Sequence, residues 1–396
     1  MANQHEDQTR TSEDETTVVA KATNRQLAVF GYAALGLAAA AAAFVILPKV
    51  LSGQNSQLPT GTLAMNSQPC ELNIAVQNPD PNQPFNAKIA LSHCAAGAGW
   101  EQAKLNTLFG RLGATWWVAP AADGNLLATV SGNAVLVWDL RTQKIVHTLK
   151  GHKDVIHTIA LSPDSKVLAT GSADKSIKLW NLQTGELLQT LEGHKGVLWA
   201  VAFSPDGQLL ASGGGDNLLR LWDLKTGKLI RSLPGHKDRI FPVAFSPDGK
   251  IIASGGKDKV IILWDVQTGK ELKTLIGHTN AVRALVFDPT GTRIISGGWD
   301  NTVRLWDVAT GQELHSFTGH KDRLVSVAIS PDGKILASGA IDNTVRLWDL
   351  EQQVPLATLS GYPDWVLSVA FSQDGNTLIS GGRDGTIAIW SKSVKK

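Results

Sequence analysis

The residue types of a hydrolase triad recur at a constant spacing in this chain. His194, Ser212 and Asp216 form one such set. A serine hydroxyl beside a histidine that a carboxylate orients is the arrangement used for nucleophilic attack on a carbonyl carbon. Because the same set returns in five repeats, whereas an enzyme usually carries one catalytic site, we expect these residues to hold a repeated structure together. The secondary-structure elements predicted around these residues indicate which repeated structure they hold together.

These residues lie in an internal repeat of 42 residues, which seven tryptophans mark without one insertion: Trp138, Trp180, Trp222, Trp264, Trp306, Trp348 and Trp390. Between the marks are apolar runs of strand length, such as 197–203 and 209–212, separated by Ser-Pro-Asp-Gly and Lys-Thr-Gly turns. Runs that are apolar at nearly every position are typical of strands covered on both faces. The repeat therefore predicts four short strands per unit, in small sheets that stack in a ring.

A Gly-His pair near one end of each unit, as in Gly193-His194, and a Trp-Asp pair near the other, as in Trp222-Asp223, resemble the WD40 repeat. The resemblance covers residues 103–396 and implies an all-β, seven-bladed WD40 β-propeller. Among WD40 proteins, the chain resembles membrane-anchored WD repeat proteins of bacteria, those of cyanobacteria included. Two units depart from the Trp-Asp pair, at Trp180-Asn181 and Trp390-Ser391.

The seventh unit stops after its third strand, so one outer strand is missing at the end of the chain. Residues 103–109 align with the outer strand 186–192, and we expect them to complete blade seven. Pairing the first strand with the last blade would close the ring and remove its exposed edges. Blades one and seven are the least regular, with Arg111 and Tyr362 in the histidine position and Asn133 near the aspartate position.

The resemblance also implies a role for the repeated polar residues. In the WD40 family, the His before the first strand, the Ser or Thr of the second, the Asp of the following turn and the Trp of the third form a hydrogen-bonded tetrad. A buried imidazole or indole N–H without a partner costs about 1–3 kcal/mol, so a satisfied tetrad favours one packing of the sheet. The five complete sets are His152, Thr170, Asp174 and Trp180; His194, Ser212, Asp216 and Trp222; His236, Ser254, Asp258 and Trp264; His278, Ser296, Asp300 and Trp306; and His320, Ser338, Asp342 and Trp348.

The composition excludes several classes of protein. With 43% hydrophobic and 18% charged residues, the chain is neither wholly disordered nor a polytopic membrane protein. A formal net charge of +2 disfavours nucleic-acid binding, and two cysteines are too few for most cysteine-based zinc sites. The sequence contains no G-x-S-x-G elbow, Walker loop, H-E-x-x-H helix or kinase catalytic-loop set. We therefore expect no catalytic residues, no cofactor and no metal, and do not expect an enzyme.

Variation among the seven copies indicates where a partner would bind. Near the start of the first strand and just before the turn aspartate, the copies differ and carry large aromatic or basic residues, the types enriched at interface hot spots. In the family resembled, these positions face the top entrance of the propeller. An alternative is that the first-strand aromatics fill the space between blades, although the basic residues are harder to bury. The predicted partner-binding residues are Trp116, His157, Trp199, Arg239, Phe241, Lys257, Arg283, Trp299, Arg323, Trp365 and Arg383.

The region ahead of the repeats contains a candidate membrane anchor. Residues 1–26 are polar and are expected to form a disordered tail, and 48–69 a flexible linker. The 21 residues that begin at Leu27 and end at Leu47 carry no charge and are long enough for a helix to cross a bilayer core. A signal peptide and a buried helix are the alternatives. The basic residues before this span favour a cytoplasmic N-terminus and an exported propeller, in the periplasm or a lumen, with a cytoplasmic propeller as the alternative.

Two cysteines flank a predicted hairpin at residues 70–94. Its strands are expected at 71–77 and 87–93, with Cys70 and Cys94 at their feet. In an oxidising compartment these cysteines could form one disulfide, and in the cytosol they would be free thiols.

Together these patterns predict a membrane-tethered WD40 scaffold that docks a protein or peptide partner on the top face of its propeller. The alternative is a membrane-tethered propeller enzyme or small-ligand sensor that uses the central channel. That alternative predicts a charged, pocket-lining set confined to one blade.

Overall fold

The computed structural model describes residues 117–392, apart from 122, 123 and 143, and three earlier strands: β1 (Cys70–Val76), β2 (Ala87–Ser92) and β3 (Lys104–Leu108). Several sequence predictions lie outside these described residues. They are the tail 1–26, the candidate anchor 27–47, the linker 48–69, Cys94 and Trp116. Among the described residues, no helix is long and apolar enough to cross a membrane.

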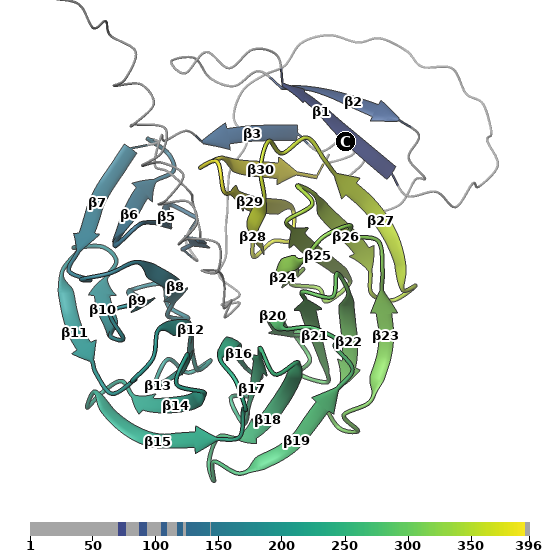
Figure 1. The fold of residues 1–396 in the computed structure, drawn as a ribbon. Coiled ribbons are helices and arrows are strands. Elements are labelled where there is room, and N and C mark those ends of the chain that lie inside the picture. Colours follow the sequence, from purple (N-terminus) through teal and green to yellow (C-terminus); the bar gives the residue numbers. More distant parts are fainter. Residues whose placement is uncertain are drawn as a thin grey trace, which may run out of the picture. The chain divides into compact units, whose positions relative to one another are not determined.

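Seven antiparallel sheets, the blades, are arranged in a ring around a central channel (Figure 1). The strands nearest the channel, called inner strands here, contact one another from each blade to the next and back to the first. They are β4 (Val118–Pro120), β8 (Ile156–Leu161), β12 (Leu198–Phe203), β16 (Ile240–Phe245), β20 (Val282–Phe287), β24 (Leu324–Ile329) and β28 (Val366–Phe371). The second strands are β5 (Leu126–Ser131), β9 (Val167–Ser172), β13 (Leu209–Gly214), β17 (Ile251–Gly256), β21 (Arg293–Gly298), β25 (Ile335–Ala340) and β29 (Thr377–Gly382).

The third and fourth strands follow outward in the same order. The third strands are β6 (Ala134–Asp139), β10 (Ile177–Asn181), β14 (Leu218–Asp223), β18 (Val260–Asp265), β22 (Val303–Asp307), β26 (Val345–Asp349) and β30 (Ile387–Ser391). The outer strands of blades one to six are β7 (Lys144–Lys150), β11 (Leu187–Leu191), β15 (Lys228–Pro234), β19 (Glu271–Ile276), β23 (Glu313–Phe317) and β27 (Val354–Leu359). The all-β, seven-bladed propeller is therefore as the sequence predicted.

Burial decreases from the inner to the outer strand of a blade. Inner strands such as β8 are buried at every residue, because neighbouring blades cover both faces. Outer strands such as β15 are exposed at nearly every residue, and they carry exposed apolar side chains such as Leu229 and Ile230 as well as polar ones. Glycines at one position of the second strands let the blades approach closely. At Gly213, an added Cβ would lie 2.5 Å from Ile240 of the next blade.

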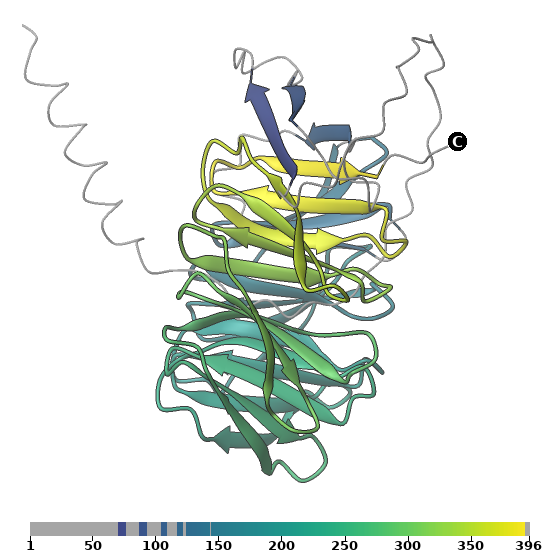
Figure 2. The ribbon, with the colours of Figure 1, turned by 90° about the vertical axis from the view of Figure 1, so that its right-hand side faces the viewer.

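Blade seven obtains its outer strand from the beginning of the propeller. β3 pairs antiparallel with β30, from Lys104 opposite Ser391 to Leu108 opposite Ile387. Figure 2 shows this blue strand beside the yellow strands of the last blade. The segment is the one that the repeat alignment placed at this edge, and its pairing leaves no blade with fewer than four strands.

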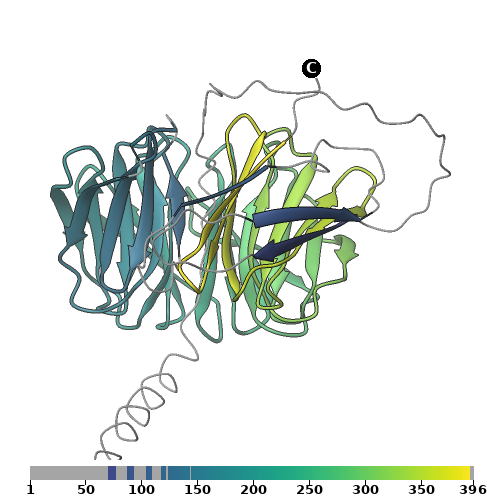
Figure 3. The same cartoon turned by 90° about the horizontal axis from the view of Figure 1, so that it is seen from above.

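The hairpin of β1 and β2 extends blade six. The two strands pair antiparallel, from Glu71 opposite Ser92 to Val76 opposite Ala87. β1 also pairs in parallel with β27, so this sheet has six strands (Figure 3). Parallel strands are not joined by a short turn, so the local sequence contains no turn motif that would predict the pairing of β1 with β27.

Candidate functional site

Each complete tetrad ties the second and third strands of a blade to the start of its inner strand. In blade four, His236 Nδ1 lies 2.9 Å from Asp258 Oδ2, and His236 Nε2 lies 2.8 Å from Ser254 Oγ. The indole Nε1–H of Trp264 donates to the same hydroxyl at 2.8 Å. Blades two, three, five and six repeat the arrangement.

The hydroxyl groups of these tetrads are inaccessible to a substrate. Thr170, Ser212, Ser254, Ser296 and Ser338 are all 0% exposed, and each accepts an indole hydrogen. The hydrogen bonds resemble those of a hydrolase triad, but a carbonyl carbon has no route to the oxygen. The arrangement is suited to fixing strands.

The carboxylates of the tetrads are held in the charged form. Burial opposes ionisation of Asp174, but hydrogen bonds from the Ser176 hydroxyl, backbone N–H groups and His152 outweigh it and lower its pKa to about 2. Burial also opposes ionisation of Asp342, but the hydrogen bond and charge of His320, with hydrogen bonds from Thr344 and the Lys321 backbone, lower its pKa to about 2. In blade three, Arg220 Nη1 also donates to Asp216 Oδ2 at 2.6 Å. The sequence interpretation missed Arg220, although its position four residues after Asp216 could have indicated that the two side chains interact.

Blades one and seven keep reduced versions of the tetrad. In blade seven, the Tyr362 hydroxyl takes the histidine position, 2.6 Å from Ser380 Oγ, and accepts from Trp390 Nε1 at 2.8 Å. In blade one, Trp138 Nε1 donates to Thr129 Oγ1 at 3.0 Å. Thr129 lies four residues before Asn133, the spacing of the other blades, so the repeat could have identified it.

The top face is the end of the ring where the inner strands begin and where the turns with the tetrad aspartates lie. Here the second residue of six inner strands is skipped in the pairing with the second strand, which makes a β-bulge. A bulge re-aims the side chain of the unpaired residue. The residues at these bulges are His157, Trp199, Phe241, Arg283, Val325 and Leu367.

Five residues at the top of the channel contact one another across four blades; we call them the channel cluster: His157, Trp199, Phe241, Arg283 and Trp299. The His157 ring stacks on Trp199 at 4.5 Å between centroids, and Trp199 meets Phe241 edge-on at 5.7 Å. The guanidinium of Arg283 lies over the Phe241 ring, 3.9 Å from its centroid, and 5.2 Å from that of Trp299. Phe241 also contacts Trp299, at 5.8 Å.

The structure buries four residues that the sequence interpretation placed on an accessible surface. Arg283 is 0% exposed, Phe241 3%, Trp199 4% and His157 9%. The expectation that Arg283 would be hard to bury was wrong, because the rings of Phe241 and Trp299 flank its guanidinium. The bulges turn these side chains toward neighbouring blades, so the alternative that first-strand aromatics fill the space between blades describes Trp199 and Phe241 better.

The rim around the channel cluster holds the accessible residues of the predicted site. Arg239, Lys257 and Arg323 are exposed, and Trp365 and Arg383 are half-buried, as is Trp299 of the channel cluster. Arg323 lies 5.3 Å from the Trp299 centroid, and Arg383 4.2 Å from that of Trp365. Two acidic groups accompany them, since Lys257 pairs with Asp238 at 3.6 Å and Arg383 with Asp364 at 3.9 Å.

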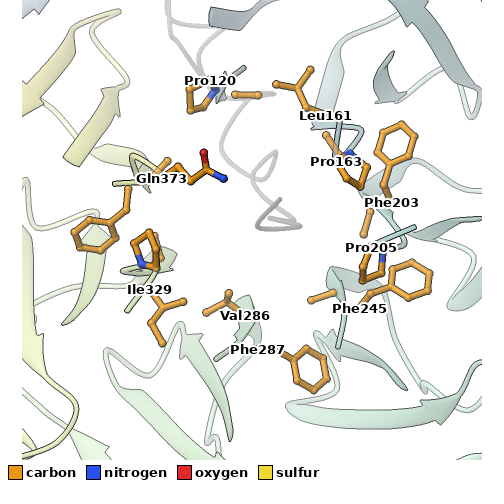
Figure 4. A pocket seen from close by; sticks show the side chains of 18 of the residues that line it. Pro120, Leu161, Pro163, Phe203, Pro205, Phe245, Val286, Phe287, Ile329 and Gln373 are labelled. Atoms are coloured by element: carbon orange, nitrogen blue, oxygen red, sulfur yellow. The ribbon is translucent and has the colours of Figure 1, made fainter. Parts of the chain in front are cut away.

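The opposite end of the channel, the bottom face, encloses a cavity of about 520 Å³. Prolines and phenylalanines from successive blades line it (Figure 4): Pro163, Pro205, Pro247, Pro289, Pro331, Phe203, Phe245, Phe287 and Phe371. Asp288 is the ionisable residue among the described residues of this lining. It is fully buried and lies 3.1 Å from Arg293. Within the described part of the chain, no three His, Cys, Asp or Glu residues are grouped as a metal site would require.

The repeats define the class of protein. The chain belongs to the WD40 family, because the family model described as "WD domain, G-beta repeat" matches six successive segments: 143–181, 185–223, 227–265, 269–307, 311–349 and 353–391. Each segment begins near the outer strand of one blade and continues through three strands of the next, so every repeat links two blades.

Individual relatives match only a small part of the chain. The "Intraflagellar transport protein 122 homolog" of Danio rerio is 47% identical over 55 residues, which cover 14% of this chain and 5% of that protein. Its Xenopus tropicalis counterpart is 46% identical over 55 residues, again 14% and 5%. "Ribosome assembly protein 4" of Saccharomyces cerevisiae is 36% identical over 52 residues, 13% and 10%. These relatives are eukaryotic, so they do not support the predicted resemblance to bacterial proteins.

Proposed function

We propose that this chain is a docking scaffold whose top face binds a protein or peptide partner. The observation that carries the proposal is the contrast between the two ends of the channel. The top end gathers Arg and Trp side chains, which are enriched in interface hot spots, and the bottom end is walled by Pro, Phe and Ala. WD40 propellers in general bind protein partners, so the proposal agrees with the family.

The rival function, a channel enzyme or small-ligand sensor, has less support. It requires a charged group of one blade that faces a cavity. The bottom cavity has Asp288, but the ion pair with Arg293 and full burial leave this carboxylate without access to a ligand. We therefore propose a non-catalytic role.

The proposal includes a membrane tether. The uncharged residues 27–47 would anchor the chain with its N-terminus in the cytoplasm and its propeller outside it. After mild reduction of intact cells, an impermeant thiol reagent should label Cys70 and Cys94. Labelling that appears only after the cytosol is opened would place the propeller in the cytoplasm.

Docking is tested by crosslinking the full-length chain to its neighbours in native membranes. Arg239→Glu combined with Arg323→Glu reverses two exposed charges on the top rim. Lys166→Glu combined with Lys250→Glu is the matched control, because these lysine side chains are 71% and 80% exposed in bottom-face turns. We expect the rim variant to lose a specific crosslinked protein that the control retains.

Equal capture by both variants would contradict top-face docking and move the contact to the sides of the ring or the tether. Because all four substituted residues are exposed, both variants should unfold at the wild-type temperature, and this measurement confirms that a lost crosslink is not a folding defect.

A further inference from the structure

The top face is most basic at blade four. In each of blades two to seven, this face includes the three residues after the tetrad histidine, or after Tyr362, and the three residues centred on the turn aspartate. In blade four these are residues 237–239 and 257–259, which hold four bases and two acids. In none of the other five blades do bases outnumber acids at these positions. We call the four basic residues the blade-four patch: Lys237, Arg239, Lys257 and Lys259.

The cations of the blade-four patch are accessible and lie on two loops that contact each other. All four residues are exposed. The Lys257 N–H donates to the carbonyl of Arg239 at 2.8 Å, and the Lys257 ammonium lies 3.6 Å from the Asp238 carboxylate. Among the residues that the structure describes, this is the one ion pair of the patch. The two loops therefore present their charges on one surface, which a partner can reach without entering the channel.

Both acids of this surface are used to fix the loops. Asp258 is held by His236 and accepts from the backbone N–H of Lys237 at 2.8 Å. Asp238 accepts from the backbone N–H of Arg239 at 2.8 Å. Neither carboxylate can leave its loop without breaking these hydrogen bonds, so the surface keeps an excess of positive charge.

Lys259 occupies a backbone conformation that favours other residues. Its φ is 73°, in the left-handed region, where lysine is disfavoured and asparagine or glycine is tolerated. The equivalent residues of blades three, five and six are asparagines, and that of blade seven is Gly385. Blade two has Lys175 at positive φ, but its top positions hold as many acids as bases. Folding alone would favour asparagine at 259, so the lysine there indicates a use for its charge.

Blade six shows which of these residues the ring itself requires. It has the same His-Lys-Asp-Arg loop as blade four, but Ile341 and Asn343 stand at the positions of Lys257 and Lys259. Both blades have a complete tetrad. The two lysines are therefore not needed to build a blade.

We infer that the blade-four patch binds a segment of the docked partner that is rich in Asp and Glu. This inference rests on the proposed docking function and names the chemistry that the top face recognises. Three of the four cations are lysines, which act as point charges and lack the planar fork with which arginine binds one phosphate group bidentately. Several carboxylates spread along a segment suit such a surface. The whole chain has a formal net charge of +2, which disfavours a nucleic acid, because such partners are bound through many phosphates.

A fluorescent hexaglutamate peptide is the probe of this surface. Its binding to the purified full-length chain would be followed by fluorescence anisotropy at low ionic strength, where attraction between exposed charges is least screened. Lys257→Ile combined with Lys259→Asn, the patch variant, copies the residues of blade six. The matched control is Lys166→Gln combined with Lys250→Gln, which removes two bottom-face lysines and copies Gln208 of blade three.

We expect the patch variant to bind hexaglutamate at least about threefold more weakly than the wild type, and the control to bind it as the wild type does. Equal affinities for the two variants would overturn the inference. Tighter binding of a phosphoserine peptide or of single-stranded DNA of the same charge would overturn it as well.

The melting temperature separates recognition from folding. The patch variant should melt at or above the wild-type temperature, because asparagine is better suited to the positive φ of residue 259. A lower melting temperature would make the two lysines structural residues, and the inference would fail.

The docking proposal and this inference can fail separately. In the crosslinking experiment, we expect the patch variant to lose the same protein as the Arg239→Glu, Arg323→Glu rim variant. If the rim variant alone loses its partner and hexaglutamate binding does not depend on the two lysines, top-face docking stands and the acidic segment is rejected. If hexaglutamate binding depends on the lysines but neither variant loses a captured protein, docking is rejected and the patch is an adventitious anion site only.

Discussion

At the scale of single residues, each complete tetrad is a chain of hydrogen bonds whose two ends have a fixed direction. An indole can only donate and a carboxylate can only accept. In blade four, Trp264 therefore donates to Ser254 and His236 Nδ1–H donates to Asp258, and a neutral imidazole accepts at Nε2 from the Ser254 hydroxyl. Removing any member leaves another buried group without its partner, which is why five blades keep all four residue types.

Blade seven allows a test of this dependence. Tyr362→Phe removes the hydroxyl that accepts from Trp390 Nε1, so we expect a loss of about 1–3 kcal/mol in the free energy of unfolding. Tyr362→His restores the residue type of the other blades beside Ser380 and Asp384, and should cost less than about 1 kcal/mol. Urea unfolding at pH 7 measures both. Equal losses for the two variants would mean that this position acts through volume alone.

At the scale of elements, the repeat predicts what each blade shares and not what differs between blades. The tetrads could be predicted because one hydrogen-bonding task requires the same residue types every 42 residues. The burial of Arg283 could not, because it depends on a bulge in β20 and on aromatic residues of another strand, β16, and of the turn after β21. The pairing of β1 with β27 was also missed, since it joins segments far apart in sequence.

The contact between blades three and four gives an element-scale prediction. Gly213→Ala would place a Cβ 2.5 Å from Ile240 Cγ2 and 3.1 Å from Val243 Cγ2, both on the next inner strand. Overpacking of this kind costs about 1–3 kcal/mol, to be measured by urea unfolding. The control is Gly215→Ala, whose nearest neighbour would be 3.5 Å away and whose equivalent in blade two is Ala173. Comparable stabilities for the two variants would show that the blades can move apart without cost.

At the scale of the whole molecule, the ring depends on its closure. Deleting residues 103–109 removes the strand that pairs with β30 and exposes the edge of the last blade. A domain of this size loses about 2–4 °C in melting temperature per kcal/mol, and we expect a decrease of more than about 4 °C by differential scanning calorimetry. Deletion of residues 2–8 removes the same number of residues from the N-terminal tail and is the control. An unchanged melting temperature after the first deletion would show that closure by this strand does not stabilise the ring.

The tetrads of blades two, three and six give the ring a response to acid. Burial lowers the pKa of His152, His194 and His320 below the ordinary 6.5, although their aspartate partners oppose the shift. Hydrogen bonds hold the pKa of Asp174 and Asp342 at about 2, below the ordinary 3.8. In both cases the unfolded chain binds protons at a higher pH than the folded ring does. The stability that these groups contribute is therefore present at neutral pH and is lost as the pH falls.

We accordingly expect the free energy of unfolding to fall in two stages, first below pH 6.5 as the histidines of the unfolded chain take up protons, and again from pH 3.8 toward 2 as the aspartates do. Urea unfolding at half-unit intervals of pH measures this profile. His320→Tyr copies the side chain that blade seven carries at Tyr362, which does not titrate in this range because burial raises its pKa. The variant should reduce the first stage, to which His152 and His194 still contribute, and also weaken the second, because His320 helps to lower the pKa of Asp342. A wild-type stability that is constant from pH 7.5 to 5 would mean that the buried histidines exchange protons as freely as those of an unfolded chain, and the tetrads would then impose no preference for the neutral imidazole.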